Sequence, residues 1–389
     1  MAELLRGPVA LQATRVWRTY LGGALIEEWR GHESPSDGRF PEEWVASVVQ
    51  ARNPGREAVA SEGLSRVCGE DGDAEAAITL AELIERHPLP CLGRAHVEAL
   101  GTSPGVLVKL LDSAERLAIQ VHPDRETAMR LFGSAYGKTE AWYFLGGREI
   151  GGERPYVLCG FKPGMTRARW EAMFREQDIA GMIDSLHRIY PEPGDVLLIR
   201  GGLPHAIGPG NWMIEIQEPT DYTIRTERVT PSGYPLSEAA VHQGIGYDAM
   251  FDCFHYDTAS ERQLLAACKL QAVVRSEGAG WSETERIGYA DTAYFRLTEW
   301  QAEAGRSTRA ITSDDRFSVV IVLAGSGTIR WERDGAAMER TIAQGDQLFL
   351  PASMQRYTFA GADKEKLLLA QCHPAAIPGN VAQEQEELA

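Results

Sequence analysis

Four residues between positions 120 and 205 are of the types that hold divalent metal ions in proteins. Gln120 and His122 lie in LAIQVHPD, where apolar and polar residues alternate as in a β-strand with one face in the core. Side chains at i and i+2 of a strand point to the same side and can reach one ion. Glu140 in GKTEAWYFL and His205 in GGLPHAIGPG add a carboxylate and a second imidazole. Zinc accepts this mixture of ligands, and iron and manganese tolerate it, so the residue types leave the metal open.

The same four residues also have structural interpretations. They lack the tight local spacing of metal motifs such as H-E-x-x-H. A histidine in a strand is commonly a hydrogen-bonded structural residue, and a glutamate at a strand end can lie in solvent. The pattern therefore indicates a metal site without establishing it.

The composition is typical of a globular protein. The chain has 389 residues, of which 44% are hydrophobic and 24% charged, which is enough for two or three domains. Its net charge of −16 argues against nucleic acid or an anionic membrane as a partner. The six cysteines contain no C-x-x-C pair, so we expect reduced thiols in a cytoplasmic protein. We expect neither a signal peptide nor a membrane span, and the sequence does not decide between a monomer and a homodimer.

The elements that position the four residues are expected to be mainly β-strands with inserted helices. Strand-like runs include GVLVKLLD, LAIQVHP, EAWYFLGG and PYVLCGF. A helix is predicted over residues 73–88, stopped by Pro88, and a short helix is predicted after its N-cap, Asp124. Residues 163–190 predict one or two more helices, with Thr166 as an N-cap.

Two stretches in the strand-rich remainder resemble each other. GDVLLIRGGLPHAI begins at Gly194 and GDQLFLPASMQRYTF at Gly345; both pass from Gly-Asp through an apolar strand to a tight turn. With a one-residue gap, Gln355 corresponds to His205, which predicts a duplicated β-barrel whose second copy has lost a ligand. The expected organisation is a catalytic unit at 1–245 with helical insertions, a C-terminal barrel without metal ligands at 246–375, and a polar tail at 376–389.

Several stretches resemble, in order, the motifs of type I phosphomannose isomerases: VLVKLLDSAERLAIQVHPD, GKTEAWYFL, GDVLLIRGGLPHAIG and IEIQEPTDYTIR. The N-terminal VWRTYLGGALIEEW is similar to the opening region of that family, so the resemblance covers nearly the whole chain. It implies two cupin-like (jelly-roll) β-barrels of the cupin superfamily with an added helical segment. The implied activity is the interconversion of mannose 6-phosphate and fructose 6-phosphate.

The resemblance also implies which residues form the site. One zinc ion per chain would be bound by Gln120, His122, Glu140 and His205. Lys109 and Lys138 match lysines placed to attract the phosphate of the sugar, and Arg225 matches an arginine implicated in the isomerisation. Glu215 and Asp221 fall on acidic positions beside the same pocket, and the sequence does not choose between them as the general base.

The chain departs from the family pattern at two positions near these motifs. Ala118 stands where the family usually has serine, and Ile224 stands where bacterial relatives often have tyrosine. Neither change touches a metal ligand, but both bear on substrate recognition and on the need for a phosphate. The alternatives are therefore an isomerase of a related or unphosphorylated sugar, an iron-dependent cupin oxygenase, and a non-catalytic sugar-binding cupin.

Overall fold

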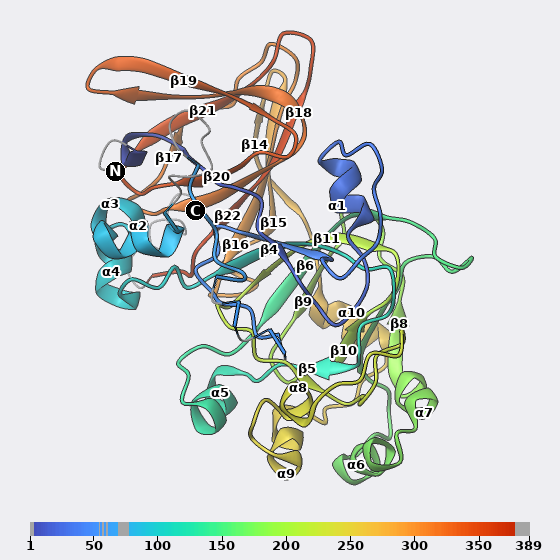
Figure 1. Ribbon diagram of the computed structural model, residues 1–389. Helices are drawn as coiled ribbons and strands as arrows, with labels where there is room; N and C mark the ends of the chain where they lie inside the picture. The colour runs from blue at the N-terminus through green and yellow to red at the C-terminus, as the bar shows by residue number, and fades with distance from the viewer. Residues whose placement is uncertain (1–3, 54, 57, 60, 69–77, 378–389) are drawn as a thin grey trace.

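The chain forms a mainly β structure, as the sequence predicts, with short helices at its periphery (Figure 1). The computed structural model describes residues 4–53, 55–56, 58–59, 61–68 and 78–377. Within these residues the strands form three sheets and no closed barrel, and neighbouring strands pair antiparallel. The expected polar tail at 376–389 lies almost entirely outside the described residues.

Two large sheets dominate the fold. From edge to edge the first contains β13 (Lys269–Leu270), β9 (Val196–Ile199), β6 (Glu140–Gly147), β11 (Asn211–Gln217), β4 (Leu107–Asp112), β3 (Glu42–Val45) and β2 (Arg15–Val16). The second contains β1 (Val9–Ala10), β20 (Gln347–Leu350), β18 (Ser318–Arg333), β22 (Leu367–His373), β16 (Arg296–Ala302), β15 (Trp281–Ile287) and β14 (Val273–Gly278). It is extended along the far half of β18 by β21 (Arg356–Gly361), β17 (Ile311–Thr312) and β19 (Ala336–Ala343).

A smaller sheet lies beside the first large one. Its strands are β12 (Ile224–Arg225), β5 (Gln120–Val121), β10 (His205–Ile207), β7 (Val157–Phe161) and β8 (Leu186–Ile189). The strand predicted over residues 117–122 is much shorter in the structure, where β5 contains only Gln120 and Val121. Residues 117–119 make backbone hydrogen bonds to neighbouring segments, but these bonds do not form a regular β-ladder.

The strand order is the same in both halves of the chain. In the two large sheets, the order β9-β6-β11-β4-β3-β2 of the first matches, strand for strand, the order β20-β18-β22-β16-β15-β14 of the second. The small sheet, in the order β5-β10-β7-β8, matches the strands β17-β21-β18-β19. The Gly-Asp turns also match, since Gly194 and Gly345 have φ of 93° and 95°. Asp195 and Asp346 each accept a hydrogen bond from the N–H three residues earlier, at 3.0 and 2.9 Å. These correspondences support the duplication inferred from the sequence.

The two halves exchange their edge strands. β1 precedes β2 in the chain but pairs with β20, and β13 precedes β14 but pairs with β9. Each half therefore receives an edge strand from the other. The exchange covers one edge of each large sheet and ties the halves together.

The register corrects the predicted counterpart of His205. His205 is the residue of β10 that pairs with both β5 and β7, and Tyr357 is the residue of β21 that pairs with both β17 and β18. The counterpart is therefore Tyr357 rather than Gln355, because the second segment is one residue longer than the first, whereas the alignment of the sequences assumed that it was one residue shorter. The second copy still lacks the imidazole.

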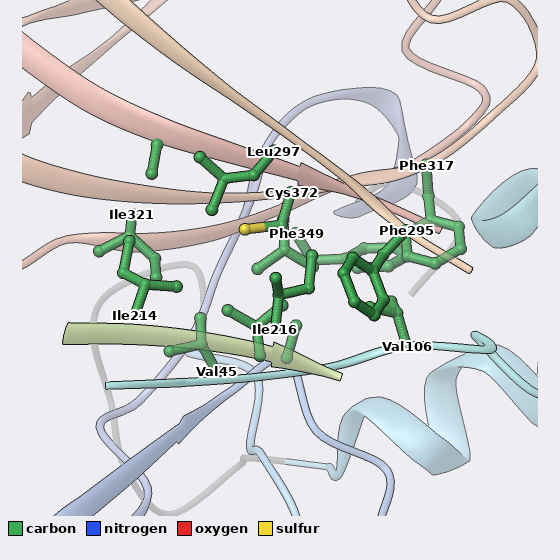
Figure 2. Close-up of a cluster of buried hydrophobic side chains, with 14 of the residues drawn as sticks. Val45, Val106, Ile214, Ile216, Phe295, Leu297, Phe317, Ile321, Phe349 and Cys372 are labelled. Atoms are coloured by element: carbon green, nitrogen blue, oxygen red, sulfur yellow. The ribbon is translucent and has the colours of Figure 1, made fainter. Parts of the chain in front are cut away.

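The two large sheets pack face to face. Figure 2 shows side chains from both sheets pointing toward one another: Val45, Ile214 and Ile216 from the first, and Leu297, Ile321, Phe349 and Cys372 from the second. Strands β4 and β6 also contribute alternate residues to this core, among them Val108 and Ala141. Because side chains alternate along a strand, the intervening residues of β4, β6 and β11 point to the opposite face of the sheet, away from the core. That opposite face carries the predicted site.

The helices are short. They are α1 (Ala24–Trp29), α2 (Leu80–Arg86), α3 (Pro88–Leu92), α4 (Arg94–Leu100), α5 (Arg125–Phe132), α6 (Arg167–Glu176), α7 (Ile179–Asp184), α8 (Glu238–His242), α9 (Tyr247–Met250) and α10 (Glu261–Cys268), with 3-10 turns at Leu4–Arg6 and Phe251–Cys253. Helices α5 to α9 gather at one end of the molecule (Figure 1), where α6 to α9 pack against the outer face of the small sheet. None of the helices in the described part of the chain has the length and hydrophobicity of a transmembrane span.

The sequence predicted the N-termini of two helices correctly from their capping residues. Asp124 and Thr166 are the N-caps of α5 and α6, as predicted, and their side chains accept hydrogen bonds from backbone N–H groups. The helix predicted over 73–88 is α2, which begins after Thr79; residues 73–77 lie outside the described residues. Pro88 follows the end of α2, as expected, but also begins α3, because proline is tolerated in the first turn of a helix.

Candidate metal centre and substrate cavity

The four predicted metal ligands lie together. Glu140 begins β6, on the face opposite the sheet-to-sheet core, and His122 directly follows β5. His205 begins β10 and pairs with Gln120 across the ladder. The turn before His205 is fixed by Gly202, whose φ is 88° and whose N–H donates to the carbonyl of His122 at 2.8 Å.

Two imidazoles converge on one carboxylate. His122 Nε2 is 3.2 Å from Glu140 Oε2, and His205 Nε2 is 3.4 Å from Glu140 Oε1. The ligand atoms of these three buried residues lie within 4.8 Å of one another. The side-chain amide of Gln120 joins them, with its Nε2 3.3 Å from His205 Nε2. Nitrogen and oxygen donors at these separations fit a divalent ion such as zinc.

The protonation of both imidazoles suits metal binding. His122 Nδ1 lies 2.8 Å from the carbonyl of Tyr222, and His205 Nδ1 lies 2.8 Å from that of Leu203. Since a carbonyl only accepts, each Nδ1 carries the hydrogen and each Nε2 presents a lone pair toward Glu140. Burial, aided by the ammonium of Lys138, lowers the pKa of His122 to about 3, so this ring is neutral at pH 7.

Lys138 lies within the ligand group. Its Nζ is 2.7 Å from Glu140 Oε2 and 2.8 Å from His122 Nε2. Burial alone would raise the pKa of Glu140, but the positive charge of Lys138 holds it well below its usual range. Trp142 Nε1 also donates to Glu140 Oε1 at 3.1 Å, so the carboxylate is ionised and fixed in orientation.

A cavity borders the ligand group. It is lined by Arg18, Thr19, Tyr20, Glu42, Arg52, Asn53, Lys109, Leu111, Leu117, Ala118, Gln120, Lys138, Ile207, Glu215, Asp221, Thr223, Arg225, Thr230 and Ala240. All the residues predicted from the family resemblance to bind substrate or catalyse thus line one cavity. It is rich in charged groups, as a site for a phosphorylated sugar requires.

Lys109 and Glu215 form a buried ion pair in this cavity. They face each other across β4 and β11, and Lys109 Nζ donates to Glu215 Oε1 at 2.7 Å. Burial raises the pKa of Glu215, although Lys109 opposes the shift. Glu215 is therefore a better proton acceptor than an ordinary surface carboxylate.

Asp221 is held differently. Its carboxylate accepts two hydrogen bonds from Arg18, both at 3.1 Å, and one from the backbone N–H of Arg52 at 2.9 Å. Although burial favours the neutral acid, Arg18 holds the pKa of Asp221 well below its usual range. A carboxylate so stabilised in its ionised form is a weak base, which separates the two acidic candidates that the sequence could not distinguish.

Arg225 lies in the cavity without a carboxylate partner. Its Nη1 donates to the carbonyl of Ala240 at 2.7 Å, and within the described residues no ion pair involves it. Burial lowers its pKa to about 10, so the guanidinium remains charged at pH 7. A partly buried cation without a carboxylate partner favours an anionic ligand or a developing negative charge.

The motif analysis missed a second group of charged residues. Arg18 bridges Asp221 and Glu42, whose Oε2 lies 2.9 Å from Arg18 Nε, and Arg52 lines both this cavity and a wider adjoining cleft. Arg18 falls within VWRTY, inside the stretch similar to the family's opening region, and this signal could have identified it. Glu42 belongs to β3, where only long-range pairing with β4 reveals its burial.

The two departures from the family pattern lie in different places. Ala118 lines the cavity next to Gln120. Ile224 is fully buried in the apolar cluster between the small sheet and the helices, and is not among the lining residues. Of the two changes, only the one at position 118 is placed to contact a substrate.

Comparison with known proteins agrees with these observations. No family model matches the chain. A mannose-6-phosphate isomerase of Streptococcus mutans is 27% identical over 279 residues, which cover 70% of this chain and 78% of that protein. One of Bacillus subtilis is 27% identical over 292 residues, covering 73% and 79%.

Solved structures extend the likeness to almost the whole chain. The mannose 6-phosphate isomerase structure from Bacillus subtilis matches with a TM-score of 0.70 at 24% identity, over 94% of this chain and 99% of that one. A phosphomannose isomerase variant from Salmonella typhimurium matches with a TM-score of 0.65 at 15% identity, over 95% and 99%. The resemblance to type I phosphomannose isomerases indicated by the sequence motifs is thereby confirmed, and the chain has the fold of these enzymes.

Proposed function

We propose that the chain is a zinc-dependent mannose-6-phosphate isomerase, which interconverts mannose 6-phosphate and fructose 6-phosphate through an enediol. The observation that carries the proposal is the buried His122–Glu140–His205 group at the edge of a charged cavity. The curated relatives named mannose-6-phosphate isomerase support it. An oxygenase would not need the buried ion pairs beside the ligands, and a binding protein would not need a full ligand set.

The residues that would hold one zinc ion are Gln120, His122, Glu140 and His205. Bound there, zinc would polarise an oxygen of the sugar and make the neighbouring C–H bond more acidic. Lys138 neutralises the carboxylate of this group, and the backbone carbonyls behind both imidazoles keep the hydrogen on Nδ1, so that Nε2 is the unprotonated nitrogen.

Glu215 is the general base in this proposal. The reaction moves a proton between C2 and C1, so one base must reach both carbons from one face of the enediol. Glu215 lines the cavity, and its burial raises its pKa. Asp221 instead orients Arg18, because its pKa is too low for it to take a proton from carbon.

Arg225 stabilises the developing enediolate. The guanidinium lines the cavity, is partly buried and donates through Nη1 to a backbone carbonyl, which leaves its other N–H groups for the substrate. A fixed cation beside an oxygen that becomes negative lowers the barrier without reorganisation.

Three cations are available to the phosphate. Lys109 and Lys138 line the cavity, and each is paired with a carboxylate. Arg52 lines the same cavity and the wider cleft, and it stacks on Tyr222 with its guanidinium 4.9 Å from the ring centre. Arg52 is the exposed member, and we propose that it contacts the phosphate together with the two lysines.

A second candidate substrate is an unphosphorylated sugar. The observation that favours it is Ala118, which lines the cavity and removes the hydroxyl usual at that position. Turnover of mannose at a higher kcat/KM than mannose 6-phosphate would select this candidate. The Ala118→Ser variant should then shift the preference toward the phosphorylated sugar.

The repeated strand order supports our expectation of two cupin-like jelly-roll units. Within the described residues, the His122–Glu140–His205 group belongs to the N-terminal one. We retain the proposed units at 1–245 and 246–375, with one edge strand of each sheet exchanged. We also propose a cytoplasmic location, because the six cysteines are scattered and contain no C-x-x-C pair.

The test is a coupled assay of mannose 6-phosphate turnover before chelation, after chelation and after zinc is added back. We expect turnover that the chelator abolishes and zinc restores. Glu215→Gln is the matched control, because it should keep the metal and remain inactive. A folded, zinc-loaded protein that turns over neither mannose 6-phosphate nor mannose would refute the proposal.

A further inference from the structure

The C-terminal half contains a second polar cavity that the proposed reaction does not use. Its walls are formed by β15, β16, β17 and β22 and by the loop after β17. These strands correspond to β3, β4, β5 and β11, which line the cavity beside the metal ligands, here called the catalytic cavity. The two cavities therefore occupy equivalent places in the duplicated fold.

Uncharged groups stand in the places of the metal ligands. Ser318 begins β18 where Glu140 begins β6, each opposite the last residue of the adjacent strand, and Tyr357 takes the place of His205. Gln371 Nε2 donates to Ser318 Oγ at 2.8 Å and to the Tyr357 hydroxyl at 2.5 Å. These groups satisfy one another, so this part of the cavity is polar and rigid and needs no metal ion.

The buried ion pair of the catalytic cavity is replaced in the same way. Glu215 and Gln371 each stand two residues before the end of their strand. Glu215 pairs with Lys109 across β11 and β4, and Gln371 pairs with Thr298 across β22 and β16. An amide and a hydroxyl thus occupy the positions of the base and the lysine.

The charged residues of the second cavity are balanced by ion pairs. Its three guanidinium groups lie 3.1, 2.7 and 3.8 Å from carboxylates, in the pairs Arg296–Glu285, Arg309–Glu283 and Arg316–Asp314. Arg296 also lies 3.8 Å from Glu283. Since these positive charges are matched by carboxylates, the cavity favours neither an anion nor a cation. An uncharged ligand fits it better than a phosphorylated one.

One buried group in this cavity lacks a partner. Thr298 is only 1% exposed, and its hydroxyl makes no hydrogen bond within the described part of the chain. Buried hydroxyls are almost always paired, and an unpaired one is costly. Because Thr298 lines the cavity, a ligand is the natural partner for its hydroxyl.

Two other polar residues of the lining flank Thr298 on the same face of the sheet. In the strand register, His373 is its diagonal neighbour on β22 and Glu283 its diagonal neighbour on β15. Diagonal neighbours lie about 7–8 Å apart, a span that a hexose ring with its hydroxyl groups can bridge. Partial burial, aided by the charges of Arg296 and Arg316, lowers the pKa of His373 well below its usual range. The neutral imidazole has one donor and one acceptor nitrogen.

We propose that this cavity is a second binding site, which holds an uncharged hexose without converting it. Each hydroxyl of a sugar both donates and accepts, which matches the hydroxyl of Thr298, the imidazole of His373 and the acceptor oxygens of Glu283. The choice of a sugar rests on the proposed function, because that function places a sugar in the equivalent cavity. The hexose is not isomerised, because Gln371 stands in the place of the base.

The test is calorimetric titration of the full-length, zinc-loaded protein with mannose, glucose and fructose in separate experiments, while mannose 6-phosphate saturates the catalytic cavity. We expect one hexose to bind per chain. Thr298→Val has nearly the same shape and removes only an unpartnered hydroxyl, so it should fold normally and weaken this binding by up to about tenfold, with kcat unchanged. His373→Phe should weaken the same event. Thr328→Val, at another unpartnered hydroxyl of this half that lies outside the cavity, is the matched control and should bind like the unaltered protein.

Three results would overturn the proposal. They are the absence of hexose binding once mannose 6-phosphate is present, equal weakening in Thr298→Val and Thr328→Val, and displacement of the hexose by inorganic phosphate. None of them changes the isomerase assay. Conversely, a chain that does not turn over mannose 6-phosphate can still bind a hexose in a manner that depends on Thr298, so failure of this proposal and failure of the proposed function are distinguishable.

Discussion

Lys109 and Glu215 lie directly opposite each other on β4 and β11, with Lys109 Nζ 2.7 Å from Glu215 Oε1 in a buried part of the cavity. The lysine keeps a buried carboxylate able to ionise, while burial raises the pKa of that carboxylate. The pair thus provides a carboxylate base whose proton affinity is higher than usual, while the charge of Lys109 limits the increase.

Replacing Lys109 with Met should move the acid limb of the pH–rate profile toward higher pH. Without the ammonium, nothing offsets the effect of burial on Glu215, so its pKa rises further and less of the base is ionised at neutral pH. Lys162→Met, at an exposed lysine, should leave the profile unchanged. An acid limb at the same pH in both variants would remove Glu215 as the base.

Replacing His122 or His205 with Ala should strip the metal and abolish activity. Each imidazole supplies one Nε2 to the ligand group, and neither has a neighbour that can take its place. The metal content per chain tests this prediction. Circular dichroism on the same samples checks that each variant is folded. His255→Ala, an exposed histidine paired with Asp124, is the matched control and should retain the metal. Full activity in a metal-free His122→Ala variant would exclude the proposed centre.

The grouping of the four candidate metal ligands was expected from the sequence mainly through the family resemblance. Gln120 and His122 are two residues apart on an extended segment, and the motifs around Glu140 and His205 resemble those of a known family. The caps of α5 and α6 were predicted from residue types and spacing alone, and the structure confirms them. Lys109, in contrast, was singled out only by the family resemblance.

What the sequence did not predict depends on long-range contacts. Glu42 and Glu43 are adjacent acidic residues that a sequence pattern would place in solvent, yet both are buried. They lie on opposite faces of β3, where Glu42 meets Arg18 and Glu43 meets Arg30. The pairing of Tyr357 with Ile311 also follows from turn length and register rather than from the pattern of residues.

Replacing Arg225 with Ala should keep the metal but reduce kcat by about 10²–10³-fold, the usual loss when one preorganised stabiliser of an oxyanion is removed. Arg225 contacts a backbone carbonyl and belongs to no ion pair in the described chain, so the fold should tolerate the change. Steady-state kinetics and metal analysis on the same preparation test this. An unchanged kcat would exclude Arg225 from the mechanism.

Replacing Asp221 with Asn should lower the free energy of unfolding at pH 7, and the difference from the unaltered protein should shrink in acid. Arg18 holds the pKa of Asp221 below its unfolded value, so the ionised carboxylate stabilises the native state above about pH 4. This contribution is lost as the pH falls through the native pKa. Breaking a buried pair from one side costs about 3–5 kcal/mol, and urea unfolding at pH 7 and at a series of pH values below about 4 measures this contribution and its loss. A difference that stayed constant or grew toward low pH would show that Asp221 is not held ionised by Arg18.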